Sequence, residues 1–198
     1  MSSKKKDKTF REEEPVKILK QPSLAKEFLE SALSLLLVVA VVFLVLHFLG
    51  QRVTVDGSSM RETLHNNDQL IVDKFTYRFL HEPERFDIIV FKVNTKADTY
   101  YIKRVVGLPG ETVQIVNSTI YINGKPIVDP YLRSQSFRSG SALFPITLGE
   151  KEYFVLGDNI NESEDSRYSV GTVNFSQIMG RAFFRFYPFS DFGLLRKQ

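Results

Sequence analysis

Hydrophobic residues in this chain form one long run, followed by many short alternating segments. The run over residues 32–49 is interrupted only by Ser34 and His47. With its flanks it reaches the about 20 apolar residues that a membrane-spanning helix needs. A cleaved leader would carry a shorter apolar core nearer the first residue, followed by a site of small residues. The pattern therefore predicts one N-terminal transmembrane helix over residues 31–50.

Positive charges are unevenly distributed around this run. Eight lysine and arginine residues precede it, whereas the first twenty residues after it contain only Arg52 and Arg61. Because positively charged flanks stay in the cytoplasm, we expect residues 1–30 to form a cytoplasmic tail. Residues 51–198 would then form a domain on the outer face of the membrane, attached by a single span.

Beyond residue 50 the hydrophobic period changes to two and β-branched residues become frequent. This alternation is typical of half-buried strands. Asn123-Gly124 adds a strong signal for a two-residue hairpin. Short strands with no amphipathic helix between them predict a mainly β, antiparallel domain. The expected strands cover residues 53–55, 69–74, 87–93, 100–106, 112–116, 119–122, 153–156 and 181–187.

Composition narrows the possible functions. The net charge is +3, and beyond the N-terminal cluster the basic residues are spread along the chain, so we expect no nucleic-acid partner. The absence of cysteine excludes disulfides and thiolate chemistry. The three histidines, His47, His65 and His81, have no metal-ligand spacing. We therefore expect neither a metal nor a cofactor.

A serine and a lysine could together form a catalytic pair. Ser59 follows a short predicted strand in a Gly-Ser turn, where small residues let a substrate backbone approach. A serine hydroxyl becomes a useful nucleophile only beside a neutral base. Lys103 can be that base only if burial or a neighbouring cation lowers its pKa by roughly two to three units from about 10.4.

The position of Lys103 within its predicted strand decides whether it can be a base. Alternation places Tyr101, Lys103 and Val105 on one face of the strand, which would remove the amine from water. Lysine is rarely buried, however. The alternative is that Lys103 faces solvent while Arg104 pairs with a carboxylate.

A third polar segment, residues 157–167, follows the strand expected at 153–156. Its Gly, Asn and Asp residues are typical of a turn, and Asp165 and Arg167 could form a charge-assisted pair that fixes the loop. The acidic residues could instead bind calcium. The spacing of an EF-hand is absent, however, which disfavours a metal site.

Taken in this order behind an apolar anchor, the three segments resemble the motifs of bacterial type I signal peptidases. The resemblance rests on the residues at 57–60, 101–110 and 157–167. It runs from the anchor at least through Arg167. It implies a β domain of signal peptidase type and a membrane-anchored serine endopeptidase of the bacterial cell membrane that removes signal peptides.

The resemblance also implies roles for individual residues. Ser59 would be the nucleophile, Lys103 the general base and Ser163 the residue that orients the lysine amine. Ser59 and Gly57 occupy the oxyanion positions, and Gly57 stands where some members have a serine, which leaves the Ser59 N–H as the main donor. The expected substrate-binding residues are Val53, Val55, Met60, Leu64, Tyr101 and Ile102. The expected structural residues near the site are Asp158, Asn159, Asp165 and Arg167.

Three further positions depart from the family pattern. Glu62 stands where proline is usual, Phe86 where glycine is usual, and Ile160 where arginine is usual. These changes predict a less rigid turn and a weaker ion network around the loop. Both members of the Ser-Lys dyad are present, so the resemblance still implies an active enzyme.

The expected partners are membrane lipid and exported preproteins with small residues at the first and third positions before the cut. Two other functions can be weighed against this one. A self-cleaving repressor of the SOS type also uses a Ser-Lys dyad, but the apolar run at 32–49 stands where a DNA-binding motif would be needed. A noncatalytic surface-assembly chaperone built on a peptidase domain remains the alternative.

Overall fold

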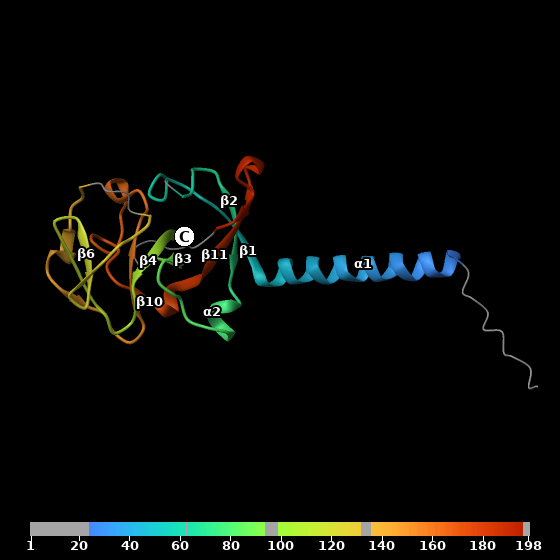
Figure 1. Cartoon of the computed structure of the whole chain (residues 1–198), viewed down its shortest axis with the longest axis horizontal. Helices are drawn as coiled ribbons and strands as arrows, with labels where there is room; N and C mark the ends of the chain where they lie inside the picture. Colours follow the sequence, from blue (N-terminus) through green and yellow to red (C-terminus); the bar gives the residue numbers. More distant parts are fainter. Residues whose placement is uncertain (1–23, 62, 94–98, 132–135, 196–198) are drawn as a thin grey trace, which may run out of the picture. The chain divides into compact units, whose positions relative to one another are not determined.

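The computed structural model describes residues 24–61, 63–93, 99–131 and 136–195. The chain divides into two compact units, Met1–Val42 and Phe43–Gln198. Helix α1 spans Leu24–Leu49 and is rich in leucine, alanine and valine (Figure 1). The segment predicted to cross the membrane, residues 31–50, lies within α1 except for Gly50, which begins the first strand. None of the helices in the described ranges is long and apolar enough to cross a membrane.

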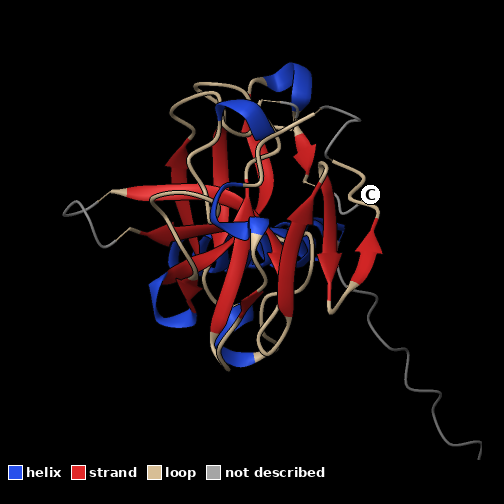
Figure 2. Cartoon of the chain, turned by 90° about the vertical axis from the view of Figure 1, so that its left-hand side faces the viewer, coloured by secondary structure: helices blue, strands red, loops and turns tan. Residues whose placement is uncertain are grey.

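Strands are the main regular secondary structure of the second unit, as Figure 2 shows. The mainly β, antiparallel prediction is therefore confirmed. The strands are β1 Gly50–Thr54, β2 Gln69–Asp73, β3 Ile88–Lys92, β4 Tyr100–Gly107, β5 Thr112–Val116, β6 Thr119–Ile122, β7 Lys125–Ile127, β8 Ile146–Thr147, β9 Glu152–Leu156, β10 Val173–Asn174, β11 Ile178–Tyr187 and β12 Gly193–Leu194. The helices of this unit are short: α2 Thr76–Phe79 and the 3-10 helices Gly140–Leu143, Ile160–Glu162, Phe175–Gln177 and Phe189–Asp191.

Two antiparallel sheets organise these strands. The larger has the order β1-β2-β11-β3-β4-β9-β10, with β12 paired to β11, and the smaller has the order β7-β6-β5-β8. Figure 1 shows β6 of the smaller sheet at the opposite end of this unit from β1 and β2. The predicted hairpin joins β6 to β7. Asn123 and Gly124 there have φ values of 51° and 75°, the left-handed region that this type of turn requires.

Strand β4 lies inside the larger sheet, between β3 and β9. Lys103 pairs with Ile89 of β3, and Arg104 pairs with Ile88 of β3 and Leu156 of β9. An interior strand with side chains packed on both faces leaves little of its surface to water. This position buries the two cationic side chains of β4.

Apolar side chains from the two faces of β4 enter different parts of the core. Ile102 packs against a cluster that also contains residues of β1, β2 and the serine turn, whereas Tyr101 and Val105 belong to a second cluster with β3 and β9. The alternation predicted for this strand is therefore confirmed. The first cluster comprises Val55, Met60, Leu64, Leu70, Val72, Ile88, Val90 and Ala182.

Candidate active site

The turn that follows β1 presents Ser59. Gly57 has a φ of 103°, a conformation that L side chains rarely adopt, so glycine suits this point of the turn. The turn then closes on itself, because the N–H of Arg61 donates to the carbonyl of Ser58 at 3.0 Å. Met60 is buried in the core, which anchors the residue next to Ser59.

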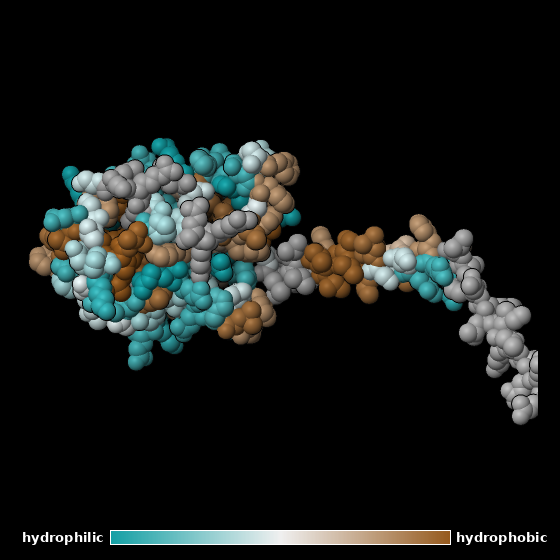
Figure 3. All heavy atoms as spheres, viewed as in Figure 1, coloured by the Kyte–Doolittle hydropathy of each residue, from teal (hydrophilic) through white to brown (hydrophobic). Residues whose placement is uncertain are grey.

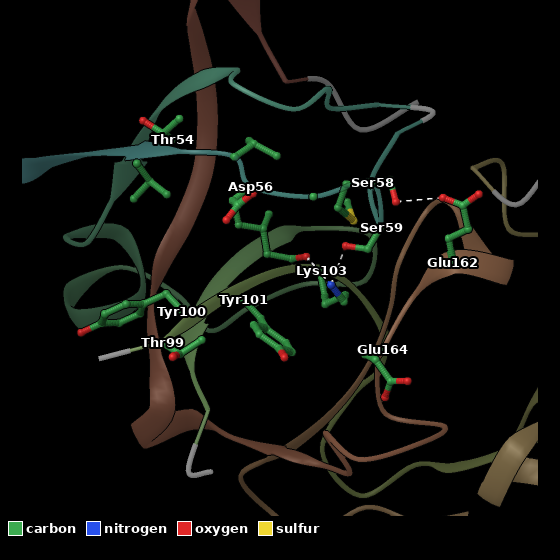
Figure 4. A pocket seen from close by; sticks show the side chains of 15 residues that line it. Thr54, Asp56, Ser58, Ser59, Thr99, Tyr100, Tyr101, Lys103, Glu162 and Glu164 are labelled. Atoms are coloured by element: carbon green, nitrogen blue, oxygen red, sulfur yellow. Dashed lines mark hydrogen bonds between the residues drawn. The ribbon is translucent and has the colours of Figure 1, made fainter. Parts of the chain in front are cut away.

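Lys103 reaches Ser59 from β4. Its Nζ donates to Ser59 Oγ at 2.7 Å and to the carbonyl of Ile102 at 3.1 Å. The amine also lies 5.2 Å from the centroid of the Tyr101 ring. Figure 4 shows the two side chains pointing toward each other, with a dashed line between them. The alternative of a solvent-facing Lys103 is wrong, because only 4% of the residue is exposed.

Burial changes the proton affinity of this amine. Desolvation lowers the pKa of Lys103 from its ordinary 10.5 to about 8, even though Asp165, Asp158 and Glu164 oppose the change by favouring the charged form. A substantial fraction of the amine is thus neutral in mildly alkaline solution. A neutral amine at hydrogen-bond distance from a hydroxyl can accept its proton.

The dyad opens onto a cleft of about 440 Å³. Of the predicted substrate-binding residues, Val53, Val55, Met60, Tyr101 and Ile102 line this cleft. Leu64 does not, which corrects its predicted role. It is fully buried in the core behind the serine turn, because the turn directs its side chain inward.

Two buried ion pairs fix the loop after β9. Arg167 pairs with Asp165 at 2.9 Å, and both side chains are almost completely buried. Arg104 pairs with Asp158 at 2.6 Å, and Asp158 also accepts from the hydroxyl of Thr63. Breaking such a pair leaves a buried charge uncompensated, so the loop is held firmly against β4 and the serine turn.

Gly157 lets this loop approach the nucleophile closely. A Cβ placed on Gly157 would lie 2.5 Å from the carbonyl oxygen of Ser59 and would also collide with Ser163. The next contact is made by Asn159, whose N–H donates to the same Ser59 carbonyl at 3.0 Å. The glycine is therefore required by a close approach between two backbones.

Two predicted site residues, Ser163 and Gly57, lack the hydrogen bonding that their expected roles require. Ser163 is buried beside Gly157, but its Oγ has no hydrogen-bond partner among the described residues, so the expected bond to Lys103 is absent. The N–H of Gly57 donates to Asn66 Oδ1 at 2.9 Å. Gly57 therefore offers no free donor to an oxyanion, because its single N–H is already engaged.

Two of the three further departures from the family pattern, Phe86 and Ile160, lie in the described residues. Phe86 takes a φ of 70°, the conformation that favours the glycine usual there, and its carbonyl accepts from Arg104. Ile160 is buried in a hydrophobic cluster, and its carbonyl accepts from Arg167 Nη2 at 2.6 Å. The loop thus keeps an arginine contact without an arginine at 160. Glu62 lies outside the described residues.

Sequence reasoning missed several polar residues at the cleft. Glu162 accepts from the Ser58 hydroxyl at 2.8 Å, and Glu162, Glu164 and Asp56 all line the cleft. Exposed carboxylates in a polar loop have no periodicity, so only the tertiary structure identifies them. Among the described residues no group of histidine, aspartate or glutamate side chains could hold a metal ion.

Comparison with known proteins places this chain in a family. Residues 28–187 match the family described as signal peptidase, peptidase S26. The chain is 37% identical to signal peptidase I S of Bacillus subtilis (strain 168), over 84% of this chain and 92% of that protein. It is 39% identical to a signal peptidase I of Bacillus amyloliquefaciens, over 80% and 84%. It is also 38% identical to a signal peptidase I of Enterococcus faecalis V583 of known crystal structure, covering 50% of this chain and 95% of that one with a TM-score of 0.43.

Proposed function

Because the chain belongs to the signal peptidase family, peptidase S26, and is a peptidase that removes signal peptides from exported preproteins, we propose that Ser59 is its nucleophile and Lys103 its general base. The observation that carries this proposal is the 2.7 Å contact between a buried amine and the Ser59 hydroxyl. Burial supplies the neutral amine, and the contact supplies the path for the proton.

The reaction follows from this geometry. Lys103 Nζ takes the Ser59 proton while Oγ bonds to the scissile carbonyl carbon. The carbonyl oxygen becomes negative and accepts from the Ser59 N–H. As the C–N bond breaks, the leaving amine takes the proton from Lys103, and an ester to Ser59 remains. Lys103 then takes a proton from water, which attacks the ester. As the ester bond breaks, Lys103 returns this proton to Ser59 Oγ and the signal peptide is released with a carboxyl group at its C-terminus.

The cleft supports a preference for small side chains before the cut. Its apolar walls are contributed by Val53, Val55, Met60, Tyr101 and Ile102. Walls of this kind exclude long side chains by overlap, whereas alanine fits with little penalty. We propose preproteins with small residues at the first and third positions before the cut as substrates.

A membrane tether through the apolar run at 32–49 belongs to the same proposal. The structure describes the side chains of this run only as far as Phe43. Large apolar side chains of α1 from Phe28 to Phe43 are 49–77% exposed, and Figure 3 shows an apolar stretch on the visible face of the helix. Apolar surface of this extent is unfavourable in water and suits lipid. Together with the positive charges before residue 32, it supports a single anchor in the bacterial cell membrane with the peptidase domain on the outer face. Alkaline extraction of membranes tests the tether: the full chain should stay with the membrane, and its release would contradict the proposal.

One cleavage assay tests the catalytic proposal. The full chain in detergent is incubated with a preprotein that carries Ala-x-Ala before its cleavage site, and the new N-terminus is sequenced. We expect one cut after the second alanine, and none with Ser59→Ala. A noncatalytic assembly chaperone, the alternative function, would leave the preprotein intact in both reactions. Equal cleavage by both proteins would show that Ser59 is not the nucleophile.

A further inference from the structure

The peptide unit between Ser58 and Ser59 is held at its carbonyl oxygen. This oxygen accepts two hydrogen bonds of 3.0 Å, one from the N–H of Arg61 and one from Asn159 Nδ2. The C=O and N–H of a trans peptide lie in one plane and point in opposite directions. Two bonds that fix the carbonyl of Ser58 therefore also fix the direction of the Ser59 N–H.

The Ser59 N–H is the donor that the proposed reaction needs. No described residue accepts a hydrogen bond from it, whereas the N–H of Gly57 is engaged with Asn66. Asn159 also donates its own N–H to the Ser59 carbonyl at 3.0 Å. The single residue Asn159 thus bonds the carbonyls of both Ser58 and Ser59, on either side of the nucleophile.

Glu162 sets the orientation of the side-chain amide of Asn159. Its Oε2 accepts from Asn159 Nδ2 at 3.1 Å and from Ser58 Oγ at 2.8 Å; Figure 4 shows the bond to Ser58. An asparagine amide can rotate so that its oxygen and nitrogen exchange places. Rotation here would set the amide oxygen against the Glu162 carboxylate and the Ser58 carbonyl, which are both acceptors. The carboxylate therefore favours the orientation that donates to Ser58.

We infer that Glu162 is a positioning residue for catalysis: through Asn159 and Ser58 it holds the Ser58–Ser59 peptide so that the Ser59 N–H points toward the developing oxyanion. This inference rests on the proposed function, because it needs Ser59 to be the nucleophile. The oxyanion forms only after attack on the carbonyl, so its alignment with the donor lowers the barrier without strengthening substrate binding. The contribution of Glu162 should therefore appear in kcat and not in KM.

The sign of the effect separates positioning from simple electrostatics. A negative charge near a developing oxyanion repels it, so loss of the Glu162 charge alone would raise kcat. Loss of the hydrogen bonds from Ser58 and Asn159 would lower kcat. Glu162→Ala removes both the charge and the bonds, whereas Glu162→Gln removes the charge and keeps an oxygen that can accept them.

The experiment measures kcat and KM of the full chain in detergent with a signal-sequence peptide as substrate. For Glu162→Ala we expect kcat about tenfold lower, less than the roughly 10²–10³-fold cost of losing a whole oxyanion donor. KM should stay within about twofold, because Glu162 acts on the donor to the oxyanion and makes no contribution to binding of the substrate before attack. Glu162→Gln should recover most of the activity. The matched control is Glu150→Gln, an exposed glutamate in the turn before β9.

Inhibitor binding gives a second readout on the same variants. A peptide aldehyde that forms a tetrahedral adduct with Ser59 should bind Glu162→Ala more weakly, by the factor that kcat has lost. The signal-peptide fragment with an amidated C-terminus carries no oxyanion and should bind as in the wild type. A defect in folding would weaken the binding of both ligands. Comparing the aldehyde with the fragment therefore keeps the inference testable if Glu162→Ala is less stable.

Three results would overturn the inference: wild-type kcat in Glu162→Ala, a loss confined to KM, or an equal loss of kcat in Glu162→Gln and Glu162→Ala. Each result is compared with the activity of Ser59→Ala in the same assay. If Ser59→Ala is inactive while Glu162→Ala is unimpaired, only the positioning role fails. If Ser59→Ala retains activity, the proposed function itself fails.

Discussion

The amine of Lys103 lies 2.7 Å from the hydroxyl oxygen of Ser59, while only 4% of the lysine is exposed. The register of β4 produces this contact, because it places Lys103 opposite Ile89 inside the sheet and directs its side chain toward the serine turn. A buried amine is costly when charged, and this cost is what makes it available as a base. The contact therefore links catalysis to measurable properties of the folded protein.

The first prediction concerns the stability cost of the buried amine. Because the pKa of Lys103 is about 8 in the folded protein and 10.5 in its ordinary state, the unfolded chain binds more protons between these pH values. Below pH 8 the folded protein carries the full cost of a buried charge, about 3 kcal/mol, which fades as the pH rises to 10.5. Lys103→Met should therefore be more stable than the wild type at pH 7.

Denaturant unfolding of the two proteins at a series of pH values checks this expectation. The advantage of Lys103→Met should shrink steadily above pH 8. Lys151→Met, at an exposed lysine, is the matched control and should show no such dependence. A wild-type stability that falls between pH 8 and 10 relative to Lys103→Met would have the wrong sign.

The second prediction concerns a neighbouring carboxylate. The charge of Glu164 raises the pKa of Lys103, opposing the effect of burial. Glu164→Gln removes this charge, so the midpoint of the pH profile of kcat/KM should move to lower pH. Glu150 is exposed and is not among the carboxylates that act on Lys103, so Glu150→Gln should leave the midpoint where it is in the wild type. A midpoint that moves upward in Glu164→Gln would contradict the assigned electrostatics.

The third prediction concerns the close approach of Gly157 to the serine turn. Gly157→Ala would place a Cβ 2.5 Å from the Ser59 carbonyl oxygen, and backbone cannot yield without moving the nucleophile. We expect a loss of kcat of about 10²-fold, since a displacement of about 1 Å has this cost. Gly149→Ala is the control, because its Cβ would meet only the end of the flexible Glu152 side chain at 3.3 Å. Similar activities of Gly157→Ala and Gly149→Ala would show that glycine is not required at position 157.

The fourth prediction concerns Ser163. Its buried Oγ has no hydrogen-bond partner in the described part of the chain, and an unsatisfied buried group costs about 1–3 kcal/mol. Ser163→Ala should therefore raise the free energy of unfolding by about 1 kcal/mol. A decrease would mean that the hydroxyl is bonded after all. The family resemblance also predicts a lower turnover for this variant, and its kcat tests that separate prediction.

The sequence predicted the parts of the fold that have a local signal. Strands of four or more residues were found because their alternation extends over enough positions, and the hairpin was found because Asn123 and Gly124 favour positive φ. The strands Ile146–Thr147, Val173–Asn174 and Gly193–Leu194 were missed. Two residues carry no detectable period, and these strands are defined only by pairing with other strands.

Site residues that belong to a sequence motif could be predicted. Site residues whose role depends on tertiary contacts could not. Ser59 and Lys103 could be named from their surroundings in the sequence, and their contact agrees with the expectation. Leu64 was expected in the cleft, but the turn directs it into the core. Gly57 was expected at the oxyanion position, but its N–H bonds to Asn66, nine residues away. Neither outcome has a signal within a few residues.

The pH dependence of kcat/KM tests the central claim most directly, because this ratio reports the ionisation of the free enzyme. If neutral Lys103 is the base, kcat/KM should rise with pH along a single ionisation with a midpoint of about 8. Lys103→Arg should be inactive throughout, since a guanidinium does not lose its proton in this range. A midpoint at or above 10.5, the ordinary pKa of lysine, would mean that the amine is solvated and is not the base.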